Sequence, residues 1–388
     1  MSDEPVLPDE PVLPDQPARP DEPVLPDYGG ACLASLVPAL LDTPGHAPAW
    51  LPEPARGARQ VVLLVLDGIG WEQLSTHAAA APTLAGGTGG PITSVVPTTT
   101  ATALTSITTG HPPAAHGVVG YRVRMEGATG SEVMNVLRWR TGSGDVRRRH
   151  RAETFQTVAP FGGRPVPAVT RAEFAATGFT AAHLGGTRLV GWSVLSTMVV
   201  EVDRLLADGE PFVYAYYDGL DKVAHERGLG RHYAQELRTV DRLVGDLLDV
   251  LPPGAALVVT SDHGQVAMDI DARLPGPDLM AGVELFSGEG RFRWLHVRPG
   301  ATDDVVAAAE EAHGDEAWVR TRRQMVDEGW FGGPLRPEVE SRLGDVALVA
   351  RAPVAFLDPA DTGETRLRGR HGSLTTSEMY VPLLAWAK

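Results

Sequence analysis

Six acidic and histidine residues of this 388-residue chain follow an apolar run or lie beside a glycine. They are Asp67, Asp221, His225, Asp262, His263 and His371. Together they offer the carboxylate and imidazole ligands that hold two divalent ions roughly 4 Å apart, one to activate a nucleophile and one to stabilise a leaving oxygen. Each residue alone has an ordinary explanation, such as a helix cap or a surface histidine. Their joint occurrence after apolar runs or beside glycines favours a two-metal site for phosphoryl chemistry.

The spacing of these residues suits metal binding. Asp221 and His225 are four residues apart, so on a helical turn both side chains project from one face and can bind a single ion. Asp218 is a weaker partner for His225. The adjacent pair Asp262 and His263 can bind together only where the backbone turns sharply after a strand, and the glycine that follows permits such a turn.

A cluster of threonines, Thr98 to Thr100, supplies candidate nucleophiles. It lies in the stretch 91–117 (PITSVVPTTTATALTSITTGHPPAAHG), which predicts a short strand, a helix of small residues and a stop at Gly110. A hydroxyl would then lie at a helix N-terminus, where unpaired N–H groups and about half a positive charge favour a phosphate oxygen or an alkoxide. The alternative is that these threonines only cap the helix.

Three apolar runs predict the elements that position these side chains. Residues 60–66, 211–217 and 255–260 show no polar alternation, as expected of parallel strands that helices cover on both faces. Each run ends in acidic or histidine residues, which predicts an open α/β sheet with its site at the carboxyl edge. Residues 231–250 have the apolar spacing of a long amphipathic helix packed on the core.

The remaining segments divide the chain into three predicted parts. Residues 1–30 repeat the hexapeptide DEPVLP, whose prolines predict a disordered acidic tail. Residues 31–267 and 346–388 form the predicted catalytic core, and 268–345 an α+β insertion that could cap the site. Residues 121–160 lack clear periodicity, and their arginine cluster is interpreted as a solvated loop, with the rim of an anionic pocket as the alternative.

Composition limits the function classes. A hydrophobic content of 43% supports a large core, and a net charge of −15 argues against a surface that coats nucleic acid. The single cysteine, Cys32, excludes an internal disulfide framework. Residues 1–27 lack the basic and apolar regions of a signal peptide, and no segment approaches the roughly 20 apolar residues of a membrane span. We therefore expect a soluble cytoplasmic protein without a membrane partner.

The motifs, taken in their order, resemble those of the alkaline phosphatase superfamily, and most closely its type I phosphodiesterase/nucleotide pyrophosphatase branch. The resemblance covers most of residues 60–265 and 365–388. It rests on VLDG, on PTTT with a downstream TTGHPPAAHGV, and on YYDGLDKVAHERG, TSDHG and GRHG. It implies an alkaline-phosphatase-like three-layer α/β fold with a mostly parallel central sheet.

The resemblance also implies a role for each candidate residue. One zinc ion would be held by Asp67, Thr100, Asp262 and His263, and the other by Asp221, His225 and His371. The motif spacing after Pro97 selects Thr100 as the nucleophile, and Thr98 and Thr99 then form the turn and the cap. Three histidines mixed with carboxylates favour zinc over magnesium, with manganese as an alternative.

The implied activity is hydrolysis of a phosphodiester or nucleotide pyrophosphate bond in a small phosphate ester, through a phosphothreonine on Thr100. One position departs from the family pattern: Ala103 replaces an asparagine that commonly holds a phosphate oxygen, although the neighbouring Thr102 offers a hydroxyl. Phosphomonoesterase, phosphonate hydrolase and phosphomutase activities on the same two-metal site therefore stay open. A sulfatase lacks its C/S-x-P-x-R motif here, and the complete ligand set disfavours a non-catalytic binding protein.

Overall fold

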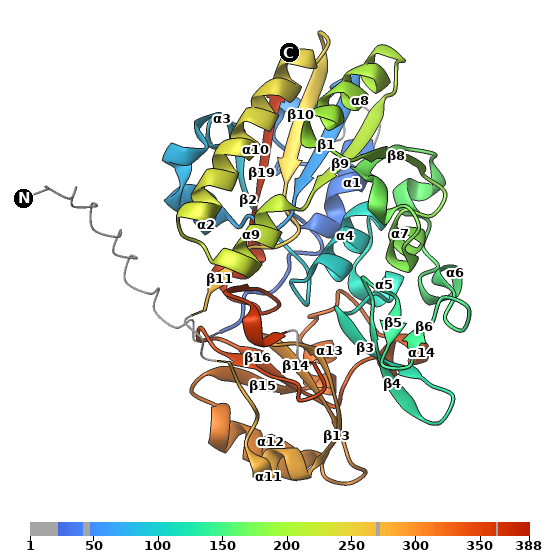
Figure 1. Cartoon of the computed structure of the whole chain (residues 1–388), viewed down its shortest axis with the longest axis vertical. Coiled ribbons are helices and arrows are strands. Elements are labelled where there is room, and N and C mark those ends of the chain that lie inside the picture. Colours follow the sequence, from blue (N-terminus) through green and yellow to red (C-terminus); the bar gives the residue numbers. More distant parts are fainter. Residues whose placement is uncertain (1–21, 42–46, 269–271, 362–363) are drawn as a thin grey trace, which may run out of the picture.

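A seven-stranded sheet forms the centre of the molecule in the computed structural model, which describes residues 22–41, 47–268, 272–361 and 364–388 (Figure 1). Its order is β2 (Thr88–Thr93), β19 (Tyr380–Ala387), β10 (Ala255–Thr260), β1 (Gln60–Leu66), β9 (Phe212–Tyr217), β7 (Pro167–Arg171) and β8 (Arg188–Trp192). The three predicted apolar strands are neighbours in this order, with β1 parallel to both β9 and β10. In this sheet, as far as the structure describes it, only β19 runs against its neighbours.

Side chains of β1 alternate between two hydrophobic cores, one on each face of the sheet. Leu63 points into a core shared with α1 (Leu33–Leu41) and α4 (Thr100–Thr109). Leu64 points into a core shared with α8 (Leu195–Ala207) and α10 (Arg231–Val250). Helices therefore cover both faces, which explains why the strand carries no polar alternation. The predicted three-layer α/β fold with a mostly parallel sheet is confirmed.

Shorter helices complete these layers. They are α2 (Trp71–Thr76), α3 (Pro82–Ala85), α5 (Pro113–His116), α6 (Ala152–Phe155), α7 (Gly178–His183), α9 (Gly219–Arg227) and α15 (Thr376–Met379). Of the helices in the described ranges, none combines the length and the apolar character that crossing a bilayer requires.

A second sheet, of four antiparallel strands, lies at the end of the molecule away from the C-terminus (Figure 1). Its order is β13 (Val283–Glu289), β14 (Phe292–Val297), β16 (Val346–Ala350) and β15 (Ala317–Thr321), with helices α11 (Pro277–Ala281), α12 (Thr302–His313), α13 (Arg322–Asp327) and α14 (Pro337–Glu340) in the same part of the chain. Residues 346–350 are predicted as part of the catalytic core. They form instead an inner strand of the second sheet, because a fully buried run does not indicate which sheet it joins.

Residues 121–160 contain a sheet that the sequence does not predict. Its strands are β3 (Arg122–Glu126), β4 (Ser131–Asn135), β5 (Arg140–Thr141) and β6 (Gly144–Asp145). Arg147 pairs with Asp145 and Arg149 with Glu132, at or near the surface. Two further ladders are β11 (Val266–Ala267) with β18 (Gly369–Arg370), and β12 (Ala272–Arg273) with β17 (Ala355–Phe356).

The N-terminal segment differs from the expected tail. Residues 22–30 belong to the described structure and contact the folded body, so the ordered chain begins before residue 31. The Val24 N–H donates to the Leu374 carbonyl at 2.9 Å, and the Tyr28 hydroxyl donates to the Trp330 carbonyl at 2.8 Å. The rest of the predicted tail, residues 1–21, lies outside the described residues.

Candidate active site

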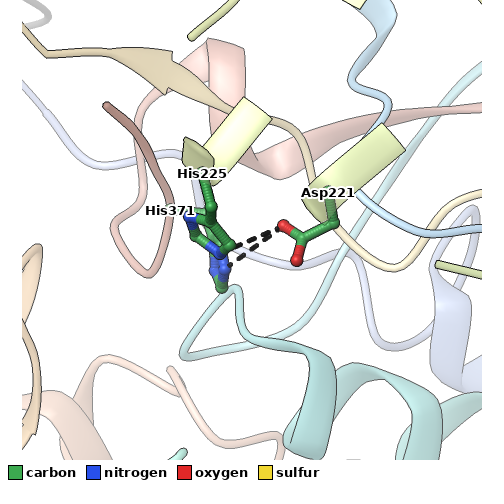
Figure 2. Close-up of side chains that lie close together, drawn as sticks. All are labelled: Asp221, His225 and His371. Carbon is green, nitrogen blue, oxygen red and sulfur yellow. Dashed lines mark ion pairs between the residues drawn. The ribbon is translucent and has the colours of Figure 1, made fainter. Parts of the chain in front are cut away.

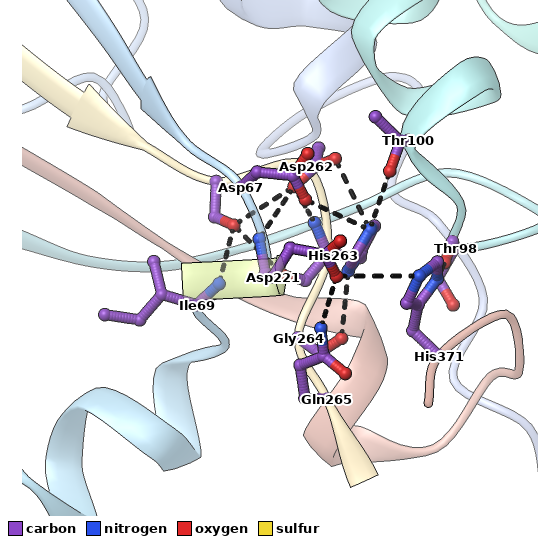
Figure 3. Close-up of polar contacts among 12 residues, drawn as sticks. Asp67, Ile69, Thr98, Thr100, Asp221, Asp262, His263, Gly264, Gln265 and His371 are labelled. Atoms are coloured by element: carbon purple, nitrogen blue, oxygen red, sulfur yellow. Dashed lines mark hydrogen bonds and ion pairs between the residues drawn. The ribbon is translucent and has the colours of Figure 1, made fainter. Parts of the chain in front are cut away.

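The ends of three central strands meet at one edge of the sheet. Leu66 of β1 lies opposite Tyr217 of β9, and Val65 opposite Thr260 of β10, so the residues that follow these strands are brought together. The Asp221 N–H donates to the Asp67 carbonyl at 3.1 Å, which ties the start of α9 to the end of β1. Figure 3 shows the resulting cluster, which includes all three acidic candidates.

Two buried aspartates each use one carboxylate oxygen and leave the other unsatisfied. Asp67 accepts a hydrogen bond from the Tyr216 hydroxyl on Oδ2, whereas its Oδ1 has no hydrogen-bond partner among the described residues. Asp262 accepts from the Gly68 and His263 N–H groups on Oδ1, and its Oδ2 likewise has no such partner there. Both unsatisfied oxygens lie near His263 Nε2, at 3.5 Å from Asp67 and 3.4 Å from Asp262. A cation at this point would satisfy them.

The pKa shifts of the two aspartates also favour a cation at this point. Burial raises the pKa of Asp67 well above its usual value, and the charges of Asp262 and Asp221 raise it further. Burial also raises the pKa of Asp262, against the lowering effect of His263. The two buried carboxylates of Asp67 and Asp262 therefore need positive charge nearby to remain ionised together. Divalent cations would supply that charge.

All three candidate histidines are oriented by the backbone. The Nδ1–H groups donate to carbonyl oxygens, at 2.7 Å from His225 to Gly369, 3.0 Å from His263 to Gly264 and 2.9 Å from His371 to Thr98. A carbonyl can only accept, so each ring carries a proton on Nδ1, and Nε2 is the ring nitrogen that can face a cation. Burial lowers the pKa of His371 well below its usual value, which keeps this ring neutral. Metal binding requires the same tautomer and charge state.

Two groups of donor atoms have the spacing of metal sites. One consists of Asp221, His225 and His371, and the other of Asp67, Asp221 and His263. The first group is the predicted second ligand set, and Figure 2 shows both imidazoles directed at the Asp221 carboxylate, with Nε2 to Oδ1 distances of 3.2 and 3.8 Å. The other group contains Asp221 where Asp262 was expected, so Asp221 lies between the two sets. The seven predicted residues are thus close together, and the donor set suits divalent cations.

Thr100 is the first residue of α4, and its Oγ1 lies 3.2 Å from His263 Nε2. The capping alternative is not realised by side chains, because Thr99 occupies the N-cap position without a side-chain hydrogen bond. The Thr98 hydroxyl instead donates to the Ser373 carbonyl at 2.7 Å and accepts from a backbone N–H of the same loop. The predicted stop of the helix at Gly110 is confirmed by its left-handed φ of 68°.

Several neighbours of the candidate ligands were not predicted. The Gln265 side chain donates to Asp221 Oδ1 at 2.6 Å, and Glu289 Oε2 lies 3.6 Å from His371 Nδ1. Gln265 directly follows the TSDHG motif, which is a signal for its position, whereas nothing in the sequence around Glu289 marks it. Ala103 and Thr102, the positions considered for a phosphate contact, are fully buried in α4.

Comparisons with solved structures agree with this fold. Among solved structures, murine ectonucleotide pyrophosphatase/phosphodiesterase 5 superposes with a TM-score of 0.61 at 16% identity, covering 84% of this chain and 87% of that chain. The human ectonucleotide pyrophosphatase/phosphodiesterase 5 gives 0.60 at 15% identity, with the same coverage. Phosphonoacetate hydrolase from Sinorhizobium meliloti 1021, in complex with phosphonoacetate, gives 0.61 at 19% identity, covering 85% and 90%. At these identities the likeness shows the fold.

Sequence comparison identifies the family. No curated protein sequence matches the chain. The profile of the type I phosphodiesterase/nucleotide pyrophosphatase family matches residues 61–374, which is most of the chain and spans every candidate site residue. The chain therefore belongs to the type I phosphodiesterase/nucleotide pyrophosphatase family of the alkaline phosphatase superfamily, and is an enzyme of this metal-dependent hydrolase type.

Proposed function

We propose that this enzyme cleaves phosphodiester or nucleotide pyrophosphate bonds in a small phosphate-ester substrate, through a covalent intermediate on Thr100. One observation carries the proposal. The Thr100 hydroxyl lies at the start of α4, 3.2 Å from His263 Nε2, beside two buried aspartates that each keep one unsatisfied oxygen. A hydroxyl beside a cation site is the arrangement expected of an activated nucleophile.

The residues fit two divalent cations. The proposed ligands of one are Asp67, Thr100, Asp262 and His263, and those of the other are Asp221, His225 and His371. The imidazole content favours zinc, with manganese as the alternative. When bound, the two ions would lower the pKa of the threonine hydroxyl and stabilise charge on the leaving oxygen.

The protein groups then carry out two displacements. The Thr100 oxygen attacks phosphorus, so that the bond from Oγ1 to phosphorus forms as the bond to the leaving oxygen breaks, and the proton lost from Oγ1 ends on the leaving alcohol. Water next attacks phosphorus, the bond from Oγ1 to phosphorus breaks, and Oγ1 takes a proton from that water, which restores the hydroxyl and releases a phosphate monoester. Throughout, the Tyr216 hydroxyl holds Asp67 and the Gln265 amide holds Asp221, so both carboxylates keep their orientation.

A phosphonate hydrolase is the second candidate. The phosphonoacetate hydrolase structure superposes as well as the phosphodiesterase structure, with a TM-score of 0.61 for each. In addition, neither Ala103 nor Thr102 has the side-chain amide that commonly contacts a phosphate oxygen in this family. The two activities differ in the bond that is broken, which a substrate panel distinguishes directly.

The test combines this panel with a nucleophile variant. We expect the zinc-loaded wild type to turn over an aryl phosphodiester faster than an aryl monoester, a sulfate ester or phosphonoacetate. Thr100→Ala should lower kcat on the order of 10³-fold or more, as loss of a nucleophile does, and phosphate should be trapped on Thr100 in the wild type. Thr197→Ala is the matched control, because Thr197 is exposed near the start of α8.

The result is decisive in either direction. Wild-type turnover by Thr100→Ala, or full activity after chelation of divalent ions, would refute the mechanism. Turnover of monoesters or phosphonoacetate without turnover of diesters would reassign the substrate class while leaving the nucleophile intact.

A further inference from the structure

The tip of the β13–β14 hairpin, residues 289–291, reaches from the second sheet to the loop that carries His371. Glu289 ends β13, is 8% exposed, and places Oε2 3.6 Å from His371 Nδ1. Its carboxyl group also fills the space above Gly372, where a Cβ atom would lie 2.7 Å from Glu289 Cγ and 2.8 Å from its carboxyl carbon. The glycine, with a φ of 127°, thus lets the carboxylate pack directly on the histidine loop.

The same hairpin tip fixes the other side of this loop. The Arg291 guanidinium donates to both carboxylate oxygens of Glu378, at 2.7 and 2.8 Å, and the two side chains are almost completely buried. Glu378 in turn accepts the Ser373 N–H at 2.9 Å. Residues 371–373 are therefore held between two side chains of one hairpin, which keeps the distance from Glu289 to His371 short.

The position of the carboxylate has a chemical consequence for His371. Its Nδ1–H donates to the Thr98 carbonyl (Figure 3), and the negative charge of Glu289 lies beside the same nitrogen. A ring that binds a cation through Nε2 gains positive charge, and a carboxylate beside Nδ1 stabilises that charge. Acidic partners of this kind raise metal affinity without touching the ion.

We propose that Glu289 is a positioning residue for His371 that strengthens binding of the divalent ion held by Asp221, His225 and His371. This inference rests on the proposed metal centre. It makes the second sheet a structural part of that centre, because the sheet supplies the charge next to a ligand.

The test measures metal affinity in place of turnover. Wild type, Glu289→Gln and Glu289→Asp are stripped of metal and titrated with Zn²⁺ against a competing chelator, with the melting temperature of each metal-free protein recorded. Glu284→Gln, on an exposed position of the same strand, is the matched control. We expect Glu289→Gln to weaken one of two Zn²⁺ sites by about 10- to 100-fold, Glu289→Asp to weaken it less, and both metal-free melting temperatures to stay at the wild-type value.

Other outcomes overturn the proposal in distinguishable ways. Unchanged affinity of both sites in Glu289→Gln would show that the carboxylate does not support His371. A lower metal-free melting temperature, with both sites weakened equally, would show a general structural role. A wild-type protein that binds neither Zn²⁺ nor Mn²⁺ would remove the proposed metal centre itself, and this inference with it.

Discussion

The buried ion pair between Arg291 and Glu378 allows a quantitative prediction about stability. In Arg291→Met, the Glu378 carboxylate loses both of its guanidinium hydrogen bonds and stays in a site where its side chain is fully buried. The guanidinium also donates to the carbonyls of Ala352 at 2.9 Å and Val354 at 3.0 Å, and these bonds disappear as well. We expect the free energy of unfolding to fall by about 3–5 kcal/mol, the cost of leaving one partner of a buried pair uncompensated.

Urea denaturation followed by tryptophan fluorescence measures this change, since Trp294 of β14 is buried in the second sheet, whose β13–β14 hairpin carries Arg291. The double variant Arg291→Met/Glu378→Gln should lose less than the sum of the two single variants, because neither charge is then left alone. Arg323→Met is the control, since the Arg323 side chain is 91% exposed and its surface ion pair is worth less than about 1 kcal/mol. A loss below about 1 kcal/mol in Arg291→Met, or strict additivity in the double variant, would refute the reasoning.

Two further predictions concern single side chains. Tyr216→Phe removes the hydroxyl that holds Asp67 Oδ2 and should weaken Zn²⁺ binding about 10- to 100-fold in a chelator competition; unchanged affinity would contradict this. His116 uses both ring nitrogens when neutral, with Ser106 and the Val118 N–H, and burial lowers its pKa to about 3. The unfolded chain protonates this histidine near pH 6.5, so the stability it contributes above that pH is lost as the pH falls toward 3. His116→Gln should therefore reduce the pH dependence of the unfolding free energy between pH 6.5 and 4, by up to about 1.4 kcal/mol per pH unit, and an unchanged slope would contradict this.

Strong periodicity explains what the sequence predicts well. The strand 60–66 and the helix 231–250 have the predicted bounds, because each carries one unbroken pattern over its whole length. The carboxyl edge of the sheet follows from these strands, since parallel neighbours end together. The candidate ligands then come to one place by topology, although they lie up to 304 positions apart, from 67 to 371.

Other features depend on contacts that a linear pattern does not contain. The strands β3 to β6 have only two to five residues each, and although β3 alternates polar and apolar residues, β4 to β6 do not, so no pattern long enough to identify the sheet is present. The segment 22–30 looks like the repeats before it, yet Val24 and Tyr28 bind to groups more than 300 residues away. Glu289 is one acidic residue among 49 Asp and Glu residues until the fold places it beside His371.

The antiparallel strand β19 sets an order on the assembly of the enzyme during synthesis. β19 joins β2 to the central sheet, and β2 leads into the loop before α4, the helix that begins at Thr100. Because β19 follows every other strand of that sheet in the chain, β2 gains its hydrogen-bonded neighbour in the sheet only after β19 has been synthesised. His371 also belongs to this late part of the chain. The loop that carries His371 and strand β19 are therefore the last parts of the described chain to join the elements around them.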